Sequence, residues 1–190
     1  MNEFQADIET CLEVLNQGGI ILYPTDTVWG LGCDATNEHA IKKIFALKKR
    51  SEAKSMIVLV ENEEAVSNYT DAALMPVHIY LRENKDPVTV IYPKAKNISS
   101  SIISNDGSVG IRVPKDSFCL NLLSKLKKPI VSTSANISGK HTPLSFSEIE
   151  EEIKKGVDYI VSYRQKEIDK GKPSQIIACD EQGRITVIRM

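Results

Sequence analysis

Three groups of side chains in this sequence have the types and spacing to bind a small anion. Residues 25–27 read Thr-Asp-Thr directly after Pro24, and residues 132–136 read Ser-Thr-Ser-Ala-Asn. Lys48 and Arg50 place two cations between these clusters in the sequence. Small hydroxyls, an amide and cations are groups that bind carboxylate and phosphate oxygens. The pattern therefore predicts a site for an anionic small molecule.

Lys48 occupies a position that favours a role in such a site. It follows Ile44 by four residues and Phe45 by three, so it continues the apolar stripe of the expected helix. A cation on that stripe points toward a cleft, and Arg50 beside it can hold a carboxylate or phosphate with two donors. The simpler interpretation is that both cations complement a helix C-terminus. We favour the binding role for Lys48 and Arg50, and the simpler one for Lys49.

Arg112 and the two hydroxyl clusters each admit a structural alternative. Arg112 interrupts an apolar strand, where an arginine needs an acceptor. That acceptor is either a ligand or the carboxylate of a structural salt bridge. The hydroxyls of residues 25–27 and 132–136 either bind ligand oxygens or cap their own turns. The residue types alone leave both alternatives open.

Apolar strands alternate with helices along the chain, which predicts an α/β fold. A terminal hairpin does not fit an all-parallel sheet, so we expect a mixed sheet flanked by helices, in a single domain over residues 1–190. Ligands in such sheets lie beyond strand ends, where loops converge. Strands are expected at residues 20–23, 56–60, 88–92, 109–113, 129–133, 159–161, 175–179 and 184–189, and helices at 8–15, 37–48, 63–68, 73–82, 118–126 and 145–155.

Composition argues against several classes of function. The net charge is −1, so no global positive field recruits nucleic acid. The first residues lack a basic segment followed by an apolar one, and no apolar run reaches spanning length, so we expect no membrane association and a cytoplasmic location. The 4 cysteines lie far apart and the 3 histidines lack ligand spacing, so we expect neither a disulfide framework nor a protein-held metal.

The sequence does not carry the common phosphate-binding loop. Residues 139–142 resemble the end of one, but the first glycine that such a loop needs is missing. In addition, Lys140 is followed by His141, where the loop has serine or threonine. If the chain uses ATP, it does so with a site outside the common nucleotide motifs.

Four motifs occur in order along the chain: Gly18-Gly19 followed by Tyr-Pro-Thr-Asp-Thr-Val-Trp-Gly-Leu-Gly at residues 23–32, Lys48-x-Arg50, Gly-Ile-Arg-Val-Pro at residues 110–114, and Ser134-Ala135-Asn136. Together they resemble the YrdC-type L-threonylcarbamoyladenylate synthases. The resemblance covers the chain from about residue 18 to residue 189 and implies a twisted α/β sheet around a concave basic cavity. It implies synthesis of threonylcarbamoyl-AMP and pyrophosphate from L-threonine, bicarbonate and ATP, for the threonylcarbamoyladenosine modification of tRNA.

The resemblance also implies roles for individual residues. Lys48 and Arg50 are the catalytic candidates, and they would act through their charge. Magnesium would accompany ATP, and a separate tRNA threonylcarbamoyl-transferase complex would receive the product. The implied threonine contacts are Thr25, Arg112, Ser134 and Ser174, and the implied ATP contacts are Lys48, Ser108, Asn136 and Arg189.

Two rival interpretations belong to other classes. A non-catalytic YrdC-like module would bind tRNA or double-stranded RNA on its concave basic surface. Such paralogues tend to lose the Ser-Ala-Asn or Lys-x-Arg residues, and this chain keeps both. A carbamoyl-transfer domain of a hydrogenase-maturation protein would need zinc-finger and acylphosphatase modules, which 190 residues cannot include. The motifs therefore favour the synthase.

Overall fold

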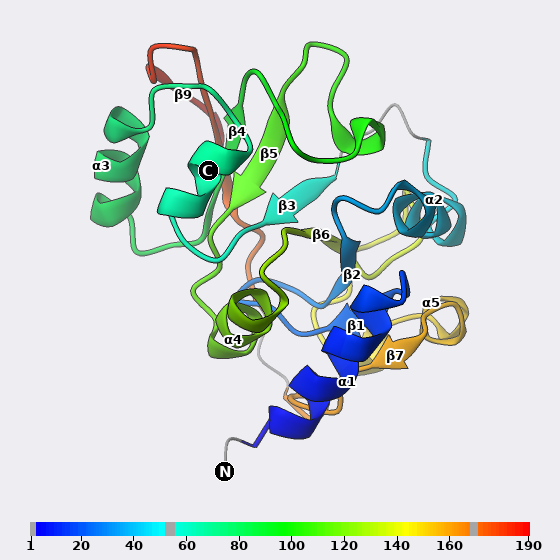
Figure 1. Ribbon diagram of the computed structural model, residues 1–190. Helices are drawn as coiled ribbons and strands as arrows, with labels where there is room; N and C mark the ends of the chain where they lie inside the picture. Colours follow the sequence, from blue (N-terminus) through cyan, green and yellow to red (C-terminus); the bar gives the residue numbers. More distant parts are fainter. Residues whose placement is uncertain (1–2, 52–55, 168–170) are drawn as a thin grey trace.

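The described residues form a nine-stranded mixed sheet at the centre of the protein (Figure 1). The computed structural model describes residues 3–51, 56–167 and 171–190. None of the described helices is long and apolar enough to cross a membrane. The strands are β1 (Ile21–Tyr23), β2 (Gly30–Asp34), β3 (Ile57–Leu59), β4 (Val88–Tyr92), β5 (Val109–Arg112), β6 (Ile130–Ser134), β7 (Tyr159–Ile160), β8 (Gln175–Cys179) and β9 (Ile185–Arg189). The α-helices are α1 (Gln5–Asn16), α2 (Glu38–Leu47), α3 (Met75–Glu83), α4 (Ser117–Leu126) and α5 (Glu151–Lys155), and the 3₁₀ helices are η1 (Glu64–Asn68), η2 (Ser100–Ile102) and η3 (Phe146–Glu148).

The strands follow the order β7-β1-β2-β6-β3-β5-β4-β8-β9 across the sheet. The pairs β1–β7, β3–β5 and β4–β8 are parallel, and the other neighbouring pairs are antiparallel. The mixed sheet and the terminal β8–β9 hairpin are thus confirmed. Register brings Ser132 of β6 opposite Gly32 of β2 on one side and Ile57 of β3 on the other. The serine-rich strand therefore lies near the middle of the sheet.

Local signals in the sequence explain where three helices begin or end. The side-chain oxygen of Asn37 accepts from the Ala40 amide at 3.1 Å and caps the start of α2. Asp116 does the same for α4, accepting from the Cys119 amide at 2.9 Å. Gly18 follows α1 with a φ of 74°, which a residue with a side chain rarely adopts. The two caps and this glycine fix the entry and exit of the chain around the sheet.

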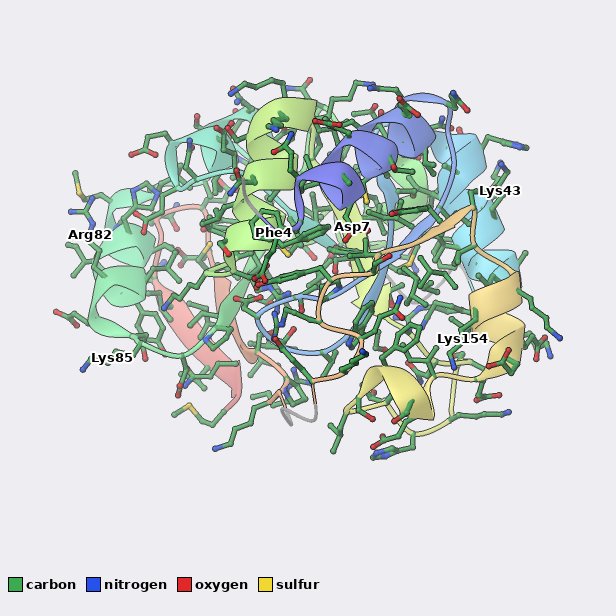
Figure 2. The ribbon with its side chains drawn as sticks, turned by 90° about the horizontal axis from the view of Figure 1, so that it is seen from below. Phe4, Asp7, Lys43, Arg82, Lys85 and Lys154 are labelled. Carbon is green, nitrogen blue, oxygen red and sulfur yellow. The ribbon has the colours of Figure 1, made fainter. Side chains whose placement is uncertain are left out.

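Alternate residues of the strands build a core on each face of the sheet. In β1, Ile21 and Tyr23 pack with α1 and α4, whereas Leu22 packs on the opposite face with α2. The ring of Phe4, just before α1, lies 5.6 Å from that of Phe118 in α4. Figures 1 and 2 show α1 and α4 side by side, while α3 and α5 lie toward opposite ends of the sheet.

Helices α1 and α4 cover only part of their face of the sheet. Ile130 of β6 and Leu59 of β3 lie in the core that these helices form. Ser132 and Ile57 each lie two residues away from these along the same strands, on the same face. Both line a cavity, and Ile57 also packs against this core. The uncovered part of this face continues over β5, β4 and β8, and it is where the candidate site lies.

Strand β2 was missed by the sequence analysis. Its sequence, Gly-Leu-Gly-Cys-Asp, is rich in poor strand formers, so local preference does not reveal it. The strand exists because it pairs with β1 on one side and β6 on the other. A Cβ at Gly32 would lie 2.7 Å from the Tyr23 ring, so close ring packing requires glycine there.

The single helix expected at residues 145–155 is wrong. The structure has a 3₁₀ turn, η3, and a separate five-residue helix, α5. The Glu148 carboxylate accepts from the Leu144 amide at 2.9 Å and from the Ser145 hydroxyl at 3.3 Å. The expected capping residues therefore stabilise the turn itself, and the chain becomes extended at Ile149 and Glu150 before α5 begins.

Candidate functional site

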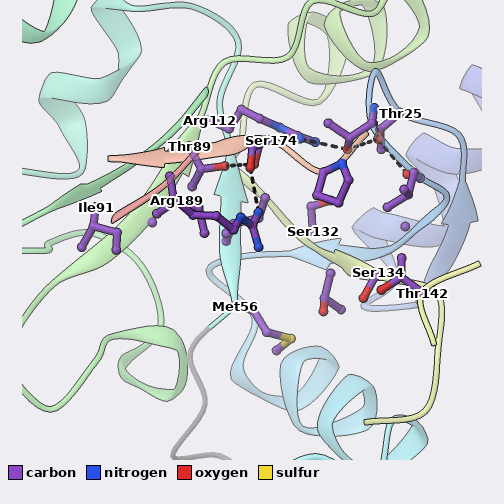
Figure 3. A pocket seen from close by; sticks show the side chains of 18 of the residues that line it. Thr25, Met56, Thr89, Ile91, Arg112, Ser132, Ser134, Thr142, Ser174 and Arg189 are labelled. Atoms are coloured by element: carbon purple, nitrogen blue, oxygen red, sulfur yellow. Dashed lines mark hydrogen bonds between the residues drawn. The ribbon is translucent and has the colours of Figure 1, made fainter. Parts of the chain in front are cut away.

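A cavity of about 580 Å³ opens on the uncovered part of the sheet (Figure 3). Its walls come from the loop after β1, the ends of β6, β8 and β9, and the middle of the sheet. The described lining residues are Thr25, Thr27, Val28, Gly30, Arg50, Met56, Ile57, Thr89, Ile91, Ser104, Asp106, Ser108, Gly110, Arg112, Ser132, Thr133, Ser134, Thr142, Pro173, Ser174, Ile176 and Arg189.

The loop after β1 is held by a chain of hydroxyl contacts that ends on Arg112. Thr25 Oγ1 accepts from the Thr27 amide at 3.0 Å and donates to the Val28 carbonyl at 2.7 Å. The two threonine hydroxyls lie 2.9 Å apart, and Arg112 Nη1 donates to Thr27 Oγ1 at 2.9 Å. These contacts place both threonines and the arginine together on the cavity wall.

Arg112 forms the structural salt bridge that was one of the two alternatives, and its side chain also lines the cavity. It is 3% exposed, lines the cavity, and forms an ion pair with Asp26 in which Nη2 lies 3.3 Å from Oδ1. The other oxygen of Asp26 accepts from the Lys115 amide at 3.0 Å. The Arg112 Nε has no hydrogen-bond partner among the described residues. The salt bridge thus holds the guanidinium at the site without using all its donors.

Lys48 is buried, as the apolar stripe predicted, but it does not line the described cavity wall. Its ammonium donates to the carbonyl oxygen of Ser134, and to the carbonyl and side-chain oxygens of Asn136 at 2.7 and 3.5 Å. The lysine therefore reaches the Ser-Ala-Asn turn from behind. The expectation that Lys48 points into the cleft is corrected, because its ammonium ends on the turn that forms the wall.

The Ser-Ala-Asn turn is held rigidly around that ammonium. Ser134 Oγ donates to Asn136 Oδ1 at 2.5 Å, while Asn136 Nδ2 donates to the carbonyls of Ile137 and Lys140 at 3.1 and 2.8 Å. The Ala135 amide donates to the Trp29 carbonyl at 3.0 Å. Ser134 is one of the described residues that line the cavity, whereas Asn136 is not in that set and lies behind Ser134. The hydrogen bonds of this turn fix the directions of the donors and acceptors that take part in them, which suits binding of a defined ligand.

The electrostatics of this wall depend on two cations. Burial and the charge of Arg50 lower the pKa of Lys48 to about 7. Burial also lowers the pKa of Arg50, which lines the cavity just beyond the end of α2. An anion bound nearby would favour the charged form of both groups. This wall is therefore prepared for negative charge.

The opposite wall is formed by β4, β8 and β9. Ser174 Oγ and Thr89 Oγ1 lie 2.8 Å apart, and Arg189 Nη2 donates to the Ser174 carbonyl at 2.7 Å (Figure 3). Ser108 Oγ donates to Asp106 Oδ1 at 2.7 Å, at the loop before β5. These contacts bring residues from three separate parts of the chain to one side of the cavity.

Among the described lining residues, the charged side chains are Arg50, Arg112, Arg189 and Asp106, which gives an excess of positive charge. No cysteine or histidine is in this set. The 4 cysteines are all buried, and burial raises the pKa of Cys11 to about 12. No group of three or more His, Cys, Asp or Glu residues in the described ranges could hold a metal ion. The cavity therefore offers charge and hydrogen-bond donors, without a thiolate.

The structure brings most of the predicted site residues together. Ser134 of the second hydroxyl cluster and Thr25 of the first line the same cavity, although the two are more than a hundred residues apart in the chain. Seven predicted residues line it, and the other two, Lys48 and Asn136, support its wall. The seven are Thr25, Arg50, Ser108, Arg112, Ser134, Ser174 and Arg189.

Sequence reasoning assigned no individual contact to several residues of the cavity. Thr27 is the direct acceptor of Arg112, although only Thr25 was assigned from that loop. Thr89 interrupts the apolar strand β4, as Arg112 does β5, and that interruption was a usable signal. Asp106 carried no comparable signal, because acidic loop residues are common on surfaces. Ser132 belongs to the predicted hydroxyl cluster of residues 132–136, but it was not assigned a contact of its own.

Comparison with known proteins relates this geometry to a family. A protein-family model named Sua5, YciO and YrdC, and described as telomere recombination, matches residues 13–190. The threonylcarbamoyl-AMP synthase of Pseudoalteromonas translucida is 32% identical over 160 residues, which cover 83% of this chain and 86% of the relative.

Two solved structures share the fold. P. abyssi Sua5 in complex with L-threonine superposes with a TM-score of 0.83 at 25% identity, and the match covers 97% of this chain and 54% of that one. The chain thus spans about half the length of that Sua5 chain. E. coli YciO superposes with a TM-score of 0.82 at 23% identity, covering 97% of this chain and 89% of YciO. At that identity, the match with YciO concerns the fold alone.

Proposed function

The chain belongs to the Sua5/YciO/YrdC family, and on that premise we propose that it is a threonylcarbamoyl-AMP synthase. It would make threonylcarbamoyl-AMP and pyrophosphate from L-threonine, bicarbonate and ATP. The observation that carries this proposal is Arg112, a buried arginine on the cavity wall beside Thr25 and Thr27. An α-carboxylate is the ligand that would use its remaining donors. The comparisons do not favour the rival interpretation as a non-catalytic RNA-binding module.

We assign the threonine side of the cavity to Thr25, Arg112, Ser134 and Ser174. Arg112 would bind the carboxylate, and the loop hydroxyls would keep its guanidinium in place. Ser134 and Ser174 line the cavity and can each bond the side-chain hydroxyl of threonine. A structure of the P. abyssi relative with L-threonine supports this class of ligand.

We assign the ATP side to Arg50, Ser108 and Arg189, with Lys48 and Asn136 behind the wall. Arg50 and Arg189 line the cavity and would neutralise phosphate charge. Lys48 would act through the turn, because its ammonium fixes the oxygens of Ser134 and Asn136. Magnesium would enter with ATP as part of the substrate and would shield the phosphates.

The proposed chemistry needs no covalent enzyme intermediate. The threonine amine attacks bicarbonate carbon, forming an N–C bond with loss of water, and gives a carbamate. A carbamate oxygen then attacks the α-phosphorus of ATP, and the bond to the bridging oxygen breaks to release pyrophosphate. The protein contributes proximity and fixed positive charge. The described residues that line the cavity include no cysteine or histidine, which fits a reaction without a covalent enzyme intermediate.

We place the product upstream of a separate tRNA threonylcarbamoyl-transferase complex, and we place the protein in the cytoplasm, where ATP and tRNA are available. A mixed anhydride of a carbamate and a phosphate is an activated acyl donor. Its consumer must therefore be a reaction that transfers the threonylcarbamoyl group to a nucleophile, such as an amine of a tRNA base. Direct contact of this chain with tRNA or double-stranded RNA is not needed for the proposed step.

The proposed function can be tested by synthesis in the absence of RNA. Purified protein is incubated with magnesium, ATP, L-threonine and labelled bicarbonate, and the label is followed by chromatography. We expect labelled threonylcarbamoyl-AMP and threonine-dependent pyrophosphate release. Arg112→Lys is expected to lose most of this activity, while Arg184→Lys, on the exposed β8–β9 turn, serves as the matched control. Absence of threonine-dependent pyrophosphate release from the wild-type protein at every magnesium concentration would reject the proposal.

A further inference from the structure

Arg164 contacts the threonine-side loop without entering the cavity. It is absent from the described cavity lining, and it borders a separate hollow of about 70 Å³ whose other wall is the loop from Pro24 to Trp29. Its Nη1 donates to the Thr25 carbonyl at 3.4 Å and to Asp116 Oδ2 at 2.9 Å. One guanidinium thus joins the loop to the N-cap of α4.

The chain around Arg164 is built to hold that side chain in place. The buried carboxylate of Asp7 accepts from the Ser162 and Tyr163 amides at 2.9 and 3.0 Å, which fixes the two residues before it. Arg164 itself has a φ of 66°, which residues other than glycine rarely adopt. Its Nε donates to the carboxylate of Glu167. The backbone therefore accepts an unfavourable conformation in the residue that supports the loop.

Gly171 supports the same loop at a second point. A Cβ added there would lie 1.3 Å from the Thr27 carbonyl oxygen, so the glycine backbone packs directly on the loop. Pro173 and Ser174 then enter the cavity wall. The chain thus touches the loop twice from outside the cavity before it contributes to the cavity itself.

We propose that Arg164 is a positioning residue for the threonine subsite, acting through the Thr25–Thr27 turn. This inference rests on the proposed function. Thr25 and Thr27 share hydroxyl contacts, and Thr27 accepts from Arg112, so a shift of the Thr25 carbonyl changes where Arg112 Nη1 finds its acceptor. The ATP side depends on other elements, because Lys48 and Asn136 are held by α2 and β6. Arg164 therefore sets the affinity for threonine and leaves that for ATP unchanged.

The test compares threonine and ATP in the same variants of the full chain. Binding of each ligand is measured by calorimetry, and the KM of each is measured in the synthesis assay. Arg164→Ala is expected to raise the threonine Kd and KM by about ten- to a hundredfold, the range produced when a binding group is displaced by about 1 Å. The ATP values are expected to stay within twofold. Arg164→Lys should show an intermediate loss, since one ammonium cannot serve Asp116 and the Thr25 carbonyl in the same geometry.

Two further variants keep the proposal falsifiable. Gly171→Ala displaces the same loop by a different contact, and it should also weaken threonine more than ATP. Arg184→Ala, on the exposed β8–β9 turn, is the control and should change the affinity for neither ligand.

Threonine affinity within twofold of wild type in Arg164→Ala, or equal losses for threonine and ATP, would overturn the positioning role. If Arg164→Ala does not fold, equal losses in Arg164→Lys overturn it in the same way. Failure of the wild-type protein to bind threonine at all would instead reject the proposed function, and the positioning role with it.

Discussion

One face of the sheet has a packed half and an open half, and the boundary between them crosses single strands. In β6, Ile130 lies in the core under α4, whereas Ser132 and Ser134, further along the same face, line the cavity. In β3, Leu59 lies in that core, and Ile57 both packs against it and lines the cavity. The packed half is filled by apolar side chains, and the open half carries hydroxyls and arginines. The face thus provides stability in one half and binding in the other, with the same backbone supporting both.

The difference lies in which half a helix covers. Leu122 of α4 is fully buried against the strands, and Phe118 packs there with Phe4. No described α-helix takes that place over Thr89 and Gly110, so the polar groups there stay available to a ligand. Gly110 lines the cavity, and a Cβ added there would lie 3.3 Å from Ile57 Cγ2, so a side chain at this position would crowd Ile57. We expect changes in the open half to alter activity, and changes in the packed half to alter stability.

The largest effect should be in the open half, through the choice of amino acid. Arg112 can bind any α-carboxylate, so selection must come from the side chain of the substrate. Valine lacks the hydroxyl of threonine and would leave Ser134 or Ser174 without a partner, so kcat/KM should fall on the order of 10⁴-fold. Serine lacks only a methyl group, which is worth about 1–3 kcal/mol, so it should be a poor but measurable substrate. Equal use of valine and serine would show that these serines do not recognise the hydroxyl.

The second effect concerns the support behind the open half. Lys48→Met keeps the apolar stem but removes the ammonium that fixes the Ser-Ala-Asn turn. Turnover should fall by roughly a hundred- to a thousandfold, as when one preorganised electrostatic group is lost. The matched control is Lys49→Met, since Lys49 is exposed and pairs with Glu152 at 2.7 Å. Both variants are compared with wild type by initial rates at saturating threonine and varied ATP. A wild-type rate in Lys48→Met would show that Lys48 is only structural.

The packed half should respond in the opposite way. Leu122→Ala removes buried methyl groups from the core between α4 and the sheet. The free energy of unfolding should fall by about 2–5 kcal/mol. Activity per folded molecule, measured at a temperature where the variant remains folded, should stay within twofold of wild type. A large loss of kcat at full folding would mean that the two halves are coupled, and the comparison between them would fail.

The two halves also differ in how much of each the sequence predicts. Apolar periodicity locates α1, α4 and the strands of the packed half, because burial repeats at fixed spacing. Strand β2 escaped this reasoning, since its glycines are explained by the Tyr23 ring and not by local preference. In the open half, motifs identify Thr25, Arg112 and Ser134, but the part played by Lys48 is set by contacts 86 and 88 residues away. Arg164 gave no signal, because its role depends on the meeting of three separate segments.

The smallest effect is a pH dependence in which stability and activity move in opposite directions. The pKa of Lys48 is lowered to about 7 in the folded protein by burial and by Arg50, whereas its ordinary value is 10.5. Between these values the unfolded chain binds more protons than the folded one, so stability rises with pH from about 7 to about 10.5. The increase is at most about 1.4 kcal/mol per pH unit. This contribution of Lys48 is measured by comparing the unfolding free energies of wild type and Lys48→Met at pH 6 to 9. The difference should shift in favour of wild type as the pH rises.

Activity should fall over the same range, because the proton lost is the charge that supports the wall. The kcat/KM for ATP reports the free enzyme, so its decline should begin near the pKa of Lys48 in that form. Arg50→Gln removes the neighbouring charge and should move both transitions to higher pH, since Arg50 is the second cause of the lowered pKa. Arg50→Gln should shift the pH transition in stability and the pH transition in kcat/KM in the same direction, although the variant also loses a cation that lines the cavity. A flat stability difference between pH 6 and 9 would show that Lys48 keeps its proton: the three oxygens that accept from its ammonium would then outweigh its burial, and the open half would hold a permanent charge.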